Sequence, residues 1–246
     1  MISSLFHTAF YNPIYNALVA LVALIPGGDI GIAVILLTIV IRLLLLPFSL
    51  SAARTQRAMK VLEPKLKELK EKHKGNKEKE ATETLALYRE ARVRPFATFL
   101  TALIQIPVLL GLYLVFRYEP FSAVDMARLY SFTPVPHALS PLFLGVIPIA
   151  GKNIVLAALA GIAQFFQAHL ALAGTMKPSG SGMQSDFQKV LGMQLKFVFP
   201  FLIGVISYTT SAAIALYFLT TNIAGMFQEL YVRRALKQES VASEEF

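Results

Sequence analysis

Hydrophobic and polar residues follow one another along this chain in long blocks. Four blocks are rich in Leu, Ile, Val, Ala and Phe and carry at most one charge each: residues 30–51, 95–116, 153–173 and 197–228. About 20 apolar residues in a helix cross a bilayer, so each of the first three blocks predicts one transmembrane helix. The fourth block is long for one span and short for two. We therefore predict two short transmembrane helices there, with a turn near residues 207–211.

A polar block, residues 52–93, separates the first two apolar blocks and has the periodicity of amphipathic helices. Apolar residues recur at spacings of three and four on both sides of Gly75-Asn76: Met59, Leu62, Leu66 and Leu69 before it, and Ala81, Leu85 and Tyr88 after it. This spacing is typical of one apolar helical face, and Gly-Asn is typical of a turn. We predict two short helices folded as an antiparallel hairpin, with their charged faces in water.

The first 28 residues mix aromatic, apolar and polar side chains and end in Pro26-Gly27-Gly28. We predict an amphipathic helix at the membrane interface, with a transmembrane helix as the alternative. No Lys or Arg precedes Arg42, so the charged leader of a secretory signal peptide is not expected. The predicted organisation is an N-terminal helix over 1–28, an all-α core of five transmembrane helices over 29–234 with the hairpin 52–93 inserted between its first two spans, and a short tail over 235–246.

The composition agrees with a membrane protein. Of the 246 residues, 55% are hydrophobic and only 15% are charged, whereas a soluble domain has about 25% charged residues. Thirteen of the 23 Lys and Arg residues lie between Arg54 and Arg94, and Arg233, Arg234 and Lys237 follow the last apolar block. Basic loops stay in the cytoplasm, so the hairpin and the C-terminus are predicted to be cytoplasmic and the N-terminus outside. Five spans satisfy this topology, and a multi-pass protein of the bacterial inner or plasma membrane is expected.

Several classes of chemistry lack the residues that they need. The chain has no Cys and only four His, which are far apart in the sequence and show no metal-ligand spacing. The apolar blocks contain no nucleophile–base pair and no paired acids, so an enzyme is not expected, and no metal or cofactor is predicted. The basic hairpin could bind nucleic acid, anionic lipid or a protein partner. Because it lies beside apolar spans it is first a topology signal, and direct nucleic-acid recognition is not expected.

Arg42 is the one charged residue within the first apolar block. A helix rises about 1.5 Å per residue, which places Arg42 about 18 Å from the outer start of the span and about 13 Å from its inner end. Arginine keeps its proton at any useful pH, and the acids nearest the other spans, Glu119 and Glu229, lie at span ends. The charge therefore predicts a water-filled cavity that receives an anion. The alternative is that Arg42 reaches the inner headgroups or hydrogen-bonds backbone carbonyls near Pro47.

Further polar residues within the apolar blocks are candidates for the lining of the same cavity. Thr38 lies one helical turn before Arg42 and therefore on the same face. The others are Gln105, Gln164, Gln167, Tyr217 and Asn222. Each alone is typical of a hydrogen bond between helices. Together they could line one polar groove, and the residues by themselves leave both interpretations open.

The order of these segments resembles the YidC/Oxa/Alb family of membrane protein insertases. The resemblance runs from about Asp29 to Arg234 and is strongest from Leu37 to Pro47 and from Met59 to Lys65. It continues through Leu85-Ala-Leu-Tyr88, Leu103-Ile-Gln-Ile-Pro107, Leu112-Tyr113, Ala215-Leu-Tyr217 and Asn222. The series in this order is specific, whereas one piece alone would be weak.

The resemblance implies a five-helix core around a hydrophilic groove that is open to the cytoplasm and to lipid and closed on the outer side. It implies an insertase or chaperone that receives hydrophilic segments of nascent membrane proteins in this groove and releases apolar segments into lipid. The family's groove positions correspond to Arg42, Thr38, Gln105 with Pro107, Leu216-Tyr217 and Asn222 and, less closely, to Gln164 and Gln167.

Nascent membrane proteins and membrane lipids are the partners that the resemblance implies, with the Sec translocon and the ribosome as further candidates. The chain departs from the family at Phe96–Leu100, where members often have small residues. Its tail ends in Ser-Glu-Glu-Phe246 instead of a long basic segment, which argues against strong ribosome anchoring by the tail. The large extracytoplasmic domain of Gram-negative members is not expected. The alternative function is a small-solute or ion transporter with Arg42 in a hydrated cavity.

Overall fold

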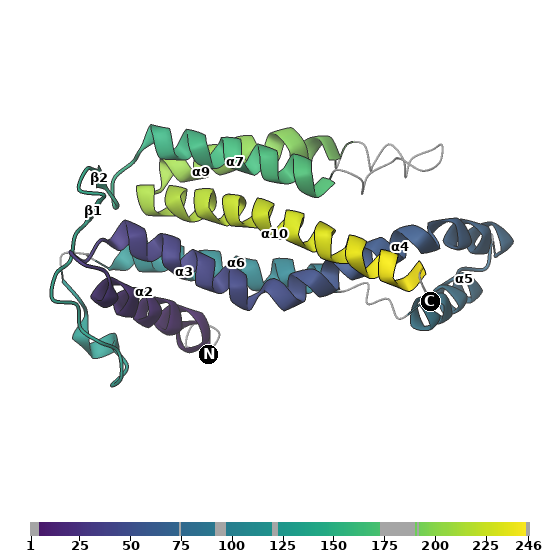
Figure 1. Cartoon of the computed structure of the whole chain (residues 1–246), viewed down its shortest axis with the longest axis horizontal. Helices are drawn as coiled ribbons and strands as arrows, with labels where there is room; N and C mark the ends of the chain where they lie inside the picture. The colour runs from purple at the N-terminus through teal and green to yellow at the C-terminus, as the bar shows by residue number, and fades with distance from the viewer. Residues whose placement is uncertain are drawn as a thin grey trace. The chain divides into compact units, whose positions relative to one another are not determined.

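The computed structural model describes residues 5–73, 75–91, 97–119, 123–172, 190 and 192–244, and the chain is mostly helical. The all-α class predicted from the sequence is confirmed. In chain order the elements are η1 (His7–Tyr11), α2 (Asn12–Leu24), α3 (Ile30–Leu44), α4 (Leu46–Lys72), α5 (Lys77–Glu90), α6 (Ala97–Tyr118), η2 (Met126–Arg128), β1 (Leu142–Phe143), β2 (Ile147–Pro148), α7 (Ile154–Leu172), η3 (Gln194–Val198), α9 (Phe199–Thr209) and α10 (Ala212–Glu244) (Figure 1).

Contacts within the chain divide it into two compact units. The first comprises Met1–Leu44 and Ile106–Leu230, and it contains α2, α3, α7, α9, most of α6 and the first part of α10. The second comprises Leu45–Gln105 and Tyr231–Phe246, and it contains α4 and α5.

The first unit has an apolar core to which α2, α3, α6 and α10 contribute. Its most buried side chains include Leu18, Ile30, Val34, Leu112 and Ile214. The apolar residues of α3 and α10 recur at helical spacing, so one face of each helix can enter the core while the opposite face stays exposed. Exposed apolar side chains remain on the outer faces, which suits a protein whose surroundings are lipid.

A tight turn joins α2 to α3. Gly27 and Gly28 have φ angles of +80° and +67°, a conformation that glycine adopts at no steric cost. A Cβ atom at Gly28 would lie only 2.0 Å from the backbone oxygen of Ala138, so this glycine also permits close contact with the later loop. The predicted helix break at Pro26-Gly27-Gly28 therefore has two physical causes, backbone conformation and packing.

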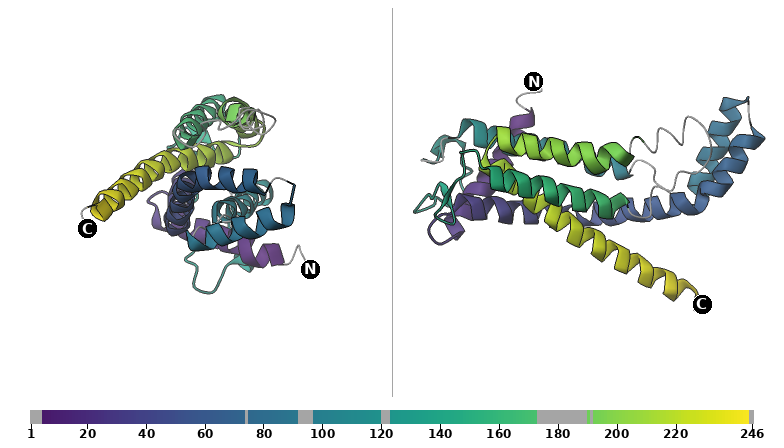
Figure 2. Two further views of the ribbon diagram at one scale, coloured as in Figure 1. Left: turned by 90° about the vertical axis from the view of Figure 1, so that its right-hand side faces the viewer. Right: turned by 90° about the horizontal axis from the view of Figure 1, so that it is seen from above.

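The helices α7 and α9 are packed closely along their length, and they lie side by side in Figures 1 and 2. A Cβ atom at Gly161 of α7 would lie 3.1 Å from the backbone oxygen of Pro200 and 3.5 Å from Cα of Gly204 on α9. Small residues at these positions let the two backbones approach each other. The end of α9 at Thr209 and the start of α10 at Ala212 agree with the turn predicted near residues 207–211.

A polar cluster attaches the segment after α6 to α2. Tyr11 donates a hydrogen bond to Glu119, and Arg128 pairs with Glu119 and Asp125 at 3.4 and 2.8 Å. Burial, followed by the hydrogen bond to Glu119, raises the pKa of the Tyr11 phenol, so the phenol keeps the proton that it donates. Asn16, nearly fully buried, extends this cluster toward the residues that follow.

Asn16 forms hydrogen bonds in both directions. Its Nδ2 donates to the backbone oxygen of Arg128 at 3.0 Å, while its Oδ1 accepts from the backbone N–H of Tyr130 at 2.7 Å and from Thr133 Oγ1 at 2.8 Å. One side chain thus satisfies three groups of the later segment, which would otherwise be costly to bury.

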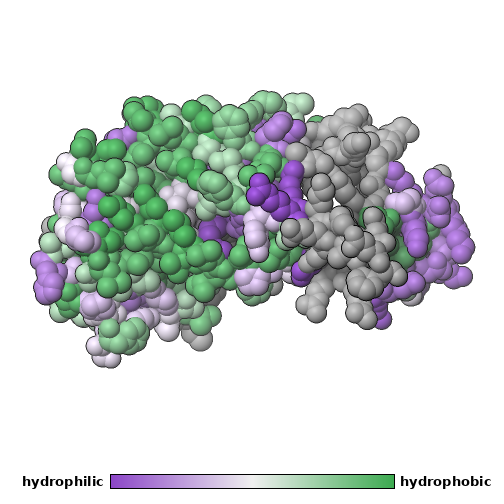
Figure 3. All heavy atoms as spheres, viewed as in Figure 1, coloured by the Kyte–Doolittle hydropathy of each residue, from purple (hydrophilic) through white to green (hydrophobic). Residues whose placement is uncertain are grey.

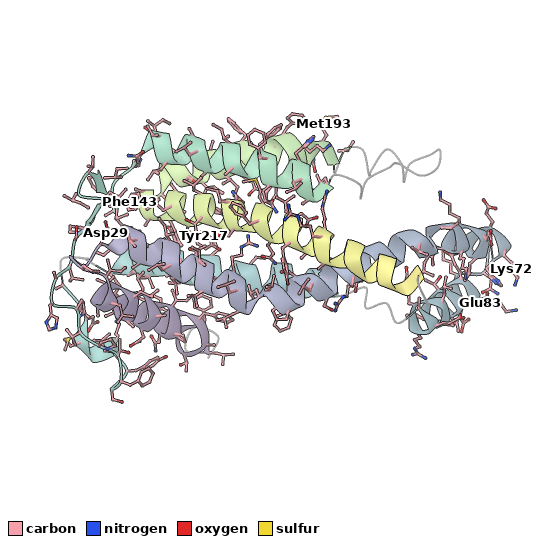
Figure 4. All side chains as sticks on the ribbon, viewed as in Figure 1. Asp29, Lys72, Glu83, Phe143, Met193 and Tyr217 are labelled. Carbon is pink, nitrogen blue, oxygen red and sulfur yellow. The ribbon has the colours of Figure 1, made fainter. Side chains whose placement is uncertain are left out.

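The short strands β1 and β2 form an antiparallel hairpin beside the start of α3. Asp29 accepts hydrogen bonds from the backbone N–H groups of Ile32 and Leu144, and the Phe143 ring covers Gly31 (Figure 4). The two strands were not among the elements predicted from the sequence.

In the second unit, α4 and α5 contact each other, and a short turn joins them. His73 Nε2 lies 2.8 Å from Glu83 Oε2, and the Asn76 side chain accepts a hydrogen bond from the backbone N–H of Lys79 at the start of α5. Gly75 has a φ angle of +102°, which suits its place in the turn. On the face that Figure 3 shows, the coloured atoms at the α4–α5 end of the chain are mostly hydrophilic.

The structure divides the first predicted span into two helices. Residues 30–51 predict one continuous helix, but α3 ends at Leu44 and α4 begins at Leu46. Proline lacks the N–H group that continues a helix but is well tolerated in a first turn, so Pro47 favours a new helix at this point. Most of the predicted tail is helical, since α10 continues to Glu244.

By length and composition, one described helix, Ile154–Leu172, suffices to cross a bilayer by itself. The pair Ile30–Leu44 and Leu46–Thr55 meets the same requirement together, as a broken span. Ile106–Tyr118 and Gln194–Thr209 are shorter apolar helices. The number of five transmembrane helices therefore stays a prediction.

Candidate functional site

Arg42 lies in the last turn of α3 and is half-buried. Its Nε atom is buried and has no hydrogen-bond partner, and none of the described carboxylates forms an ion pair with the guanidinium. A buried cation without a neighbouring anion is unfavourable unless water or an added anion reaches it. The environment of Arg42 is therefore suited to receive a negatively charged or strongly polar group.

Gln167 of α7 and Gly225 of α10 lie next to Arg42. A Cβ atom at Gly225 would lie 3.6 Å from Arg42 Nη2, 3.6 Å from Gln167 Nε2 and 3.4 Å from Gln167 Cγ. Three helices of the first unit therefore converge here, and a guanidinium and a carboxamide both adjoin the place where a side chain at position 225 would begin.

Tyr217, labelled in Figure 4, belongs to the most buried stretch of α10 and is only 1% exposed. Its phenol lies within electrostatic range of Arg42. A phenol can donate or accept a hydrogen bond, but at this burial Tyr217 belongs to the helical packing around the guanidinium.

Asn222 and Thr38 are more deeply buried than a groove lining requires. Asn222 is 3% exposed and donates a hydrogen bond from Nδ2 to the backbone oxygen of Ala160 on α7, at 3.4 Å. Thr38 is 2% exposed, and its hydroxyl donates to the backbone oxygen of Val34 one turn earlier, at 2.7 Å. Asn222 connects α10 to α7, and Thr38 satisfies its hydroxyl within α3.

For the other two predicted site residues, Gln164 and Gln105, the structure gives less detail. Gln164 is half-buried on α7, three residues before Gln167. Gln105 belongs to α6, but its side chain lies outside the described residues, as does the Phe96–Leu100 departure from the family pattern. The structure therefore brings Arg42, Gln167 and Gly225 together, with Tyr217 within electrostatic range of Arg42.

Gly225 was missed by the sequence reasoning. The signal that could have found it is an isolated glycine within an apolar helix, where glycine is unfavourable and often has a packing or functional reason. The described residues contain no group of three His, Asp or Glu side chains that could hold a metal ion. The chemistry offered near Arg42 is hydrogen-bond donation by cationic and neutral N–H groups, which suits carboxylates and amide oxygens.

Comparison with known proteins gives the family. A family model described as "60Kd inner membrane protein" matches residues 21–239. A membrane protein insertase YidC of Clostridium tetani is 27% identical over 87% of this chain and 86% of its own length. A YidC of Fusobacterium nucleatum is 30% identical over 84% of this chain and 87% of its own length, and one of Oceanobacillus iheyensis is 28% identical over 94% and 85%. This chain therefore belongs to the 60Kd inner membrane protein family, the YidC/Oxa/Alb family of bacterial membrane-integral proteins.

Proposed function

We propose that this protein is a membrane protein insertase that receives hydrophilic segments of nascent membrane proteins beside Arg42. The observation that carries the proposal is the environment of Arg42: its Nε lacks a partner, no described carboxylate neutralises it, and Gln167 and Gly225 adjoin it. The relatives named above are membrane protein insertases, which favours this function over the transport of ions or solutes.

The proposed topology has five transmembrane helices, an outer N-terminus and a cytoplasmic C-terminus. The hairpin formed by α4 and α5 would then lie in the cytoplasm. The distribution of basic residues supports this orientation, because Lys and Arg concentrate between Arg54 and Arg94 and again after Leu230. In this orientation a groove beside Arg42 would open to the cytoplasm, where nascent chains arrive.

The proposed role of the groove is to lower the cost of dehydrating a polar segment. Moving an unpaired polar group into an apolar medium costs about 2–7 kcal/mol. Donors held by Arg42 and Gln167 would replace part of the lost water, and the guanidinium would attract carboxylates of the incoming segment. The apolar segment that follows would leave sideways into lipid. Its burial stabilises the product by about 25 cal/mol per Å².

The proposed partners are nascent membrane proteins and the surrounding lipids. Cooperation with the Sec translocon or the ribosome is compatible with this function. Crosslinking in membranes with and without the translocon would distinguish obligate cooperation from independent insertion.

Substitution of Arg42 tests the proposal directly. Arg42→Ala is expected to reduce insertion of substrates with acidic tails by about tenfold or more, because a hydrogen bond to a charged group contributes about 1.5–3 kcal/mol. Arg42→Lys should retain part of the activity, because it keeps the charge but not the planar donor geometry. The measurement is the yield of protease-protected substrate in liposomes that contain the purified protein.

The control is a matched substrate whose tail carries Asn and Gln in place of Asp and Glu, since its insertion should depend less on Arg42. Thermal melts followed by circular dichroism show whether the variants are folded. Equal insertion of both substrates by wild type and Arg42→Ala, with unchanged melts, would reject the role of Arg42.

A further inference from the structure

An apolar groove runs along the outer surface where α7 and α9 meet in the first unit. Its volume is about 470 Å³, which lies within the range of small-molecule sites. Its walls are Ala158, Ile162 and Phe165 of α7 and Phe201, Val205 and Tyr208 of α9. Several of these side chains are well exposed, Phe201 by 74%. The face that carries α7 is largely hydrophobic in Figure 3. Arg42 and Gln167 do not line this groove.

The shape of the groove favours a single flexible chain over a helix. A pair of small residues usually marks a place where another helix can approach closely. Here Gly161 and Gly204 contact each other between α7 and α9, so they do not offer such a place to a further helix. The groove is lined by the large side chains of Ile162, Phe165 and Phe201. A helix with side chains is about 10–12 Å in diameter and would meet these large side chains, whereas an acyl chain could lie between them.

One end of the groove is polar. Lys152 immediately precedes α7, and its Nζ lies 6.0 Å from the centre of the Tyr208 ring, within the range of a cation–π contact. Both side chains are exposed. An ammonium group and a phenol therefore stand at the end of an otherwise apolar slot, an arrangement complementary to a phosphate that is attached to a hydrocarbon chain.

We propose that this groove binds one anionic phospholipid, with an acyl chain between α7 and α9 and the phosphate beside Lys152. Within a bilayer an acyl chain is surrounded by hydrocarbon wherever it lies, so apolar contact alone gives little selectivity. Preference must therefore come from the shape of the slot and from the charge of Lys152. The site depends only on the membrane location of the chain, and its failure would leave the proposed insertase function unaffected.

The test uses the purified full chain and phosphatidylglycerol with a photoreactive diazirine in its acyl chain. In vesicles, labelling is expected to concentrate on peptides of α7 and α9 that line the groove. Ala158→Phe should reduce this labelling by about tenfold, which corresponds to about 1.4 kcal/mol, because the new ring would fill the slot from an exposed position. Val205→Phe should do the same from the opposite wall.

The matched control is Val155→Phe, which adds the same ring to an exposed position of α7 outside the groove. It should leave the labelling unchanged. Lys152→Gln should remove the preference for phosphatidylglycerol over phosphatidylcholine in competition experiments, while labelling of the groove by either lipid persists. Circular dichroism melts check that each variant is folded.

Two results would overturn the proposal. One is labelling spread evenly over the exposed apolar surface and insensitive to both groove-filling variants. The other is capture of a protein chain in place of lipid by a photoreactive amino acid introduced at Ile162, which would assign the groove to a protein partner.

Discussion

Arg42 combines a permanent charge with an incomplete set of partners. A charge at this depth is normally paired or hydrated, and no described carboxylate pairs with it. Its neighbour Gln167 is neutral, so this carboxamide can hydrogen-bond a ligand that the guanidinium attracts. Because the guanidinium is charged and its neighbour is neutral, we expect this site to bind anionic groups more tightly than neutral polar groups.

Gly225 offers a test at the same scale. Gly225→Leu should reduce insertion of acidic substrates by about tenfold, because the side chain would occupy the volume between Arg42 and Gln167 and remove a charge-assisted hydrogen bond. Gly225→Ala is the matched control. Its Cβ would meet Arg42 and Gln167 at ordinary contact distances of 3.4–3.6 Å, and alanine stabilises a helix by about 1 kcal/mol relative to glycine.

The readout is again insertion into liposomes, alongside a thermal melt of each variant. If Gly225→Leu folds and inserts acidic substrates as well as wild type does, the space beside Gly225 has no part in substrate binding.

The elements of the first unit are joined by buried polar side chains and by small residues within their helices. Asn222 connects α10 to α7, Gly161 and Gly204 bring α7 to α9, and Asn16 attaches the segment after α6 to α2. Because each of these polar groups is buried, its loss would leave its partners without hydrogen bonds.

Asn16→Ala should therefore destabilise the protein by about 1–3 kcal/mol, the cost of leaving buried polar groups unsatisfied. The groups concerned are the backbone N–H of Tyr130 and the hydroxyl of Thr133. A lower melting temperature and faster hydrogen exchange over residues 125–133 are expected. Asn12→Ala is the control on the same helix, and an identical effect of both substitutions would contradict the assignment.

The elements also show which predictions from sequence succeed. The turn at Gly27-Gly28 was predictable because glycine and proline act locally. The break between α3 and α4 was not predicted, although Pro47 was visible, because hydrophobicity continues across it. The strands β1 and β2 are two residues each, too short for a period-two pattern, and they depend on contacts with α3.

At the scale of the whole molecule, the central quantity is the distribution of Lys and Arg, because it determines the orientation in the membrane. The chain has no Cys, which allows single introduced thiols to report the side on which each segment lies. Lys79 of α5 and Val146 between β1 and β2 are both exposed.

A thiol from Lys79→Cys should resist a membrane-impermeant maleimide in sealed spheroplasts and react after permeabilisation. A thiol from Val146→Cys should react in both preparations, since the proposed topology places this loop outside. The unmodified chain gives the background. Labelling of Lys79→Cys in sealed spheroplasts would contradict the proposed orientation of the hairpin.

The sequence by itself determined the properties that depend on the order of residues along the chain. These are an all-α membrane protein, apolar blocks separated by a basic helical segment, one charge within an apolar block, and the family. The tertiary structure decided what depends on distances between helices. Gln167 and Gly225 lie beside Arg42 only in the folded chain. The side chains of Thr38 and Asn222 form hydrogen bonds within the helical packing. An apolar groove lies between α7 and α9. The physical reason is that periodicity defines which face of a helix is apolar, whereas the rotation and separation of neighbouring helices depend on side-chain packing.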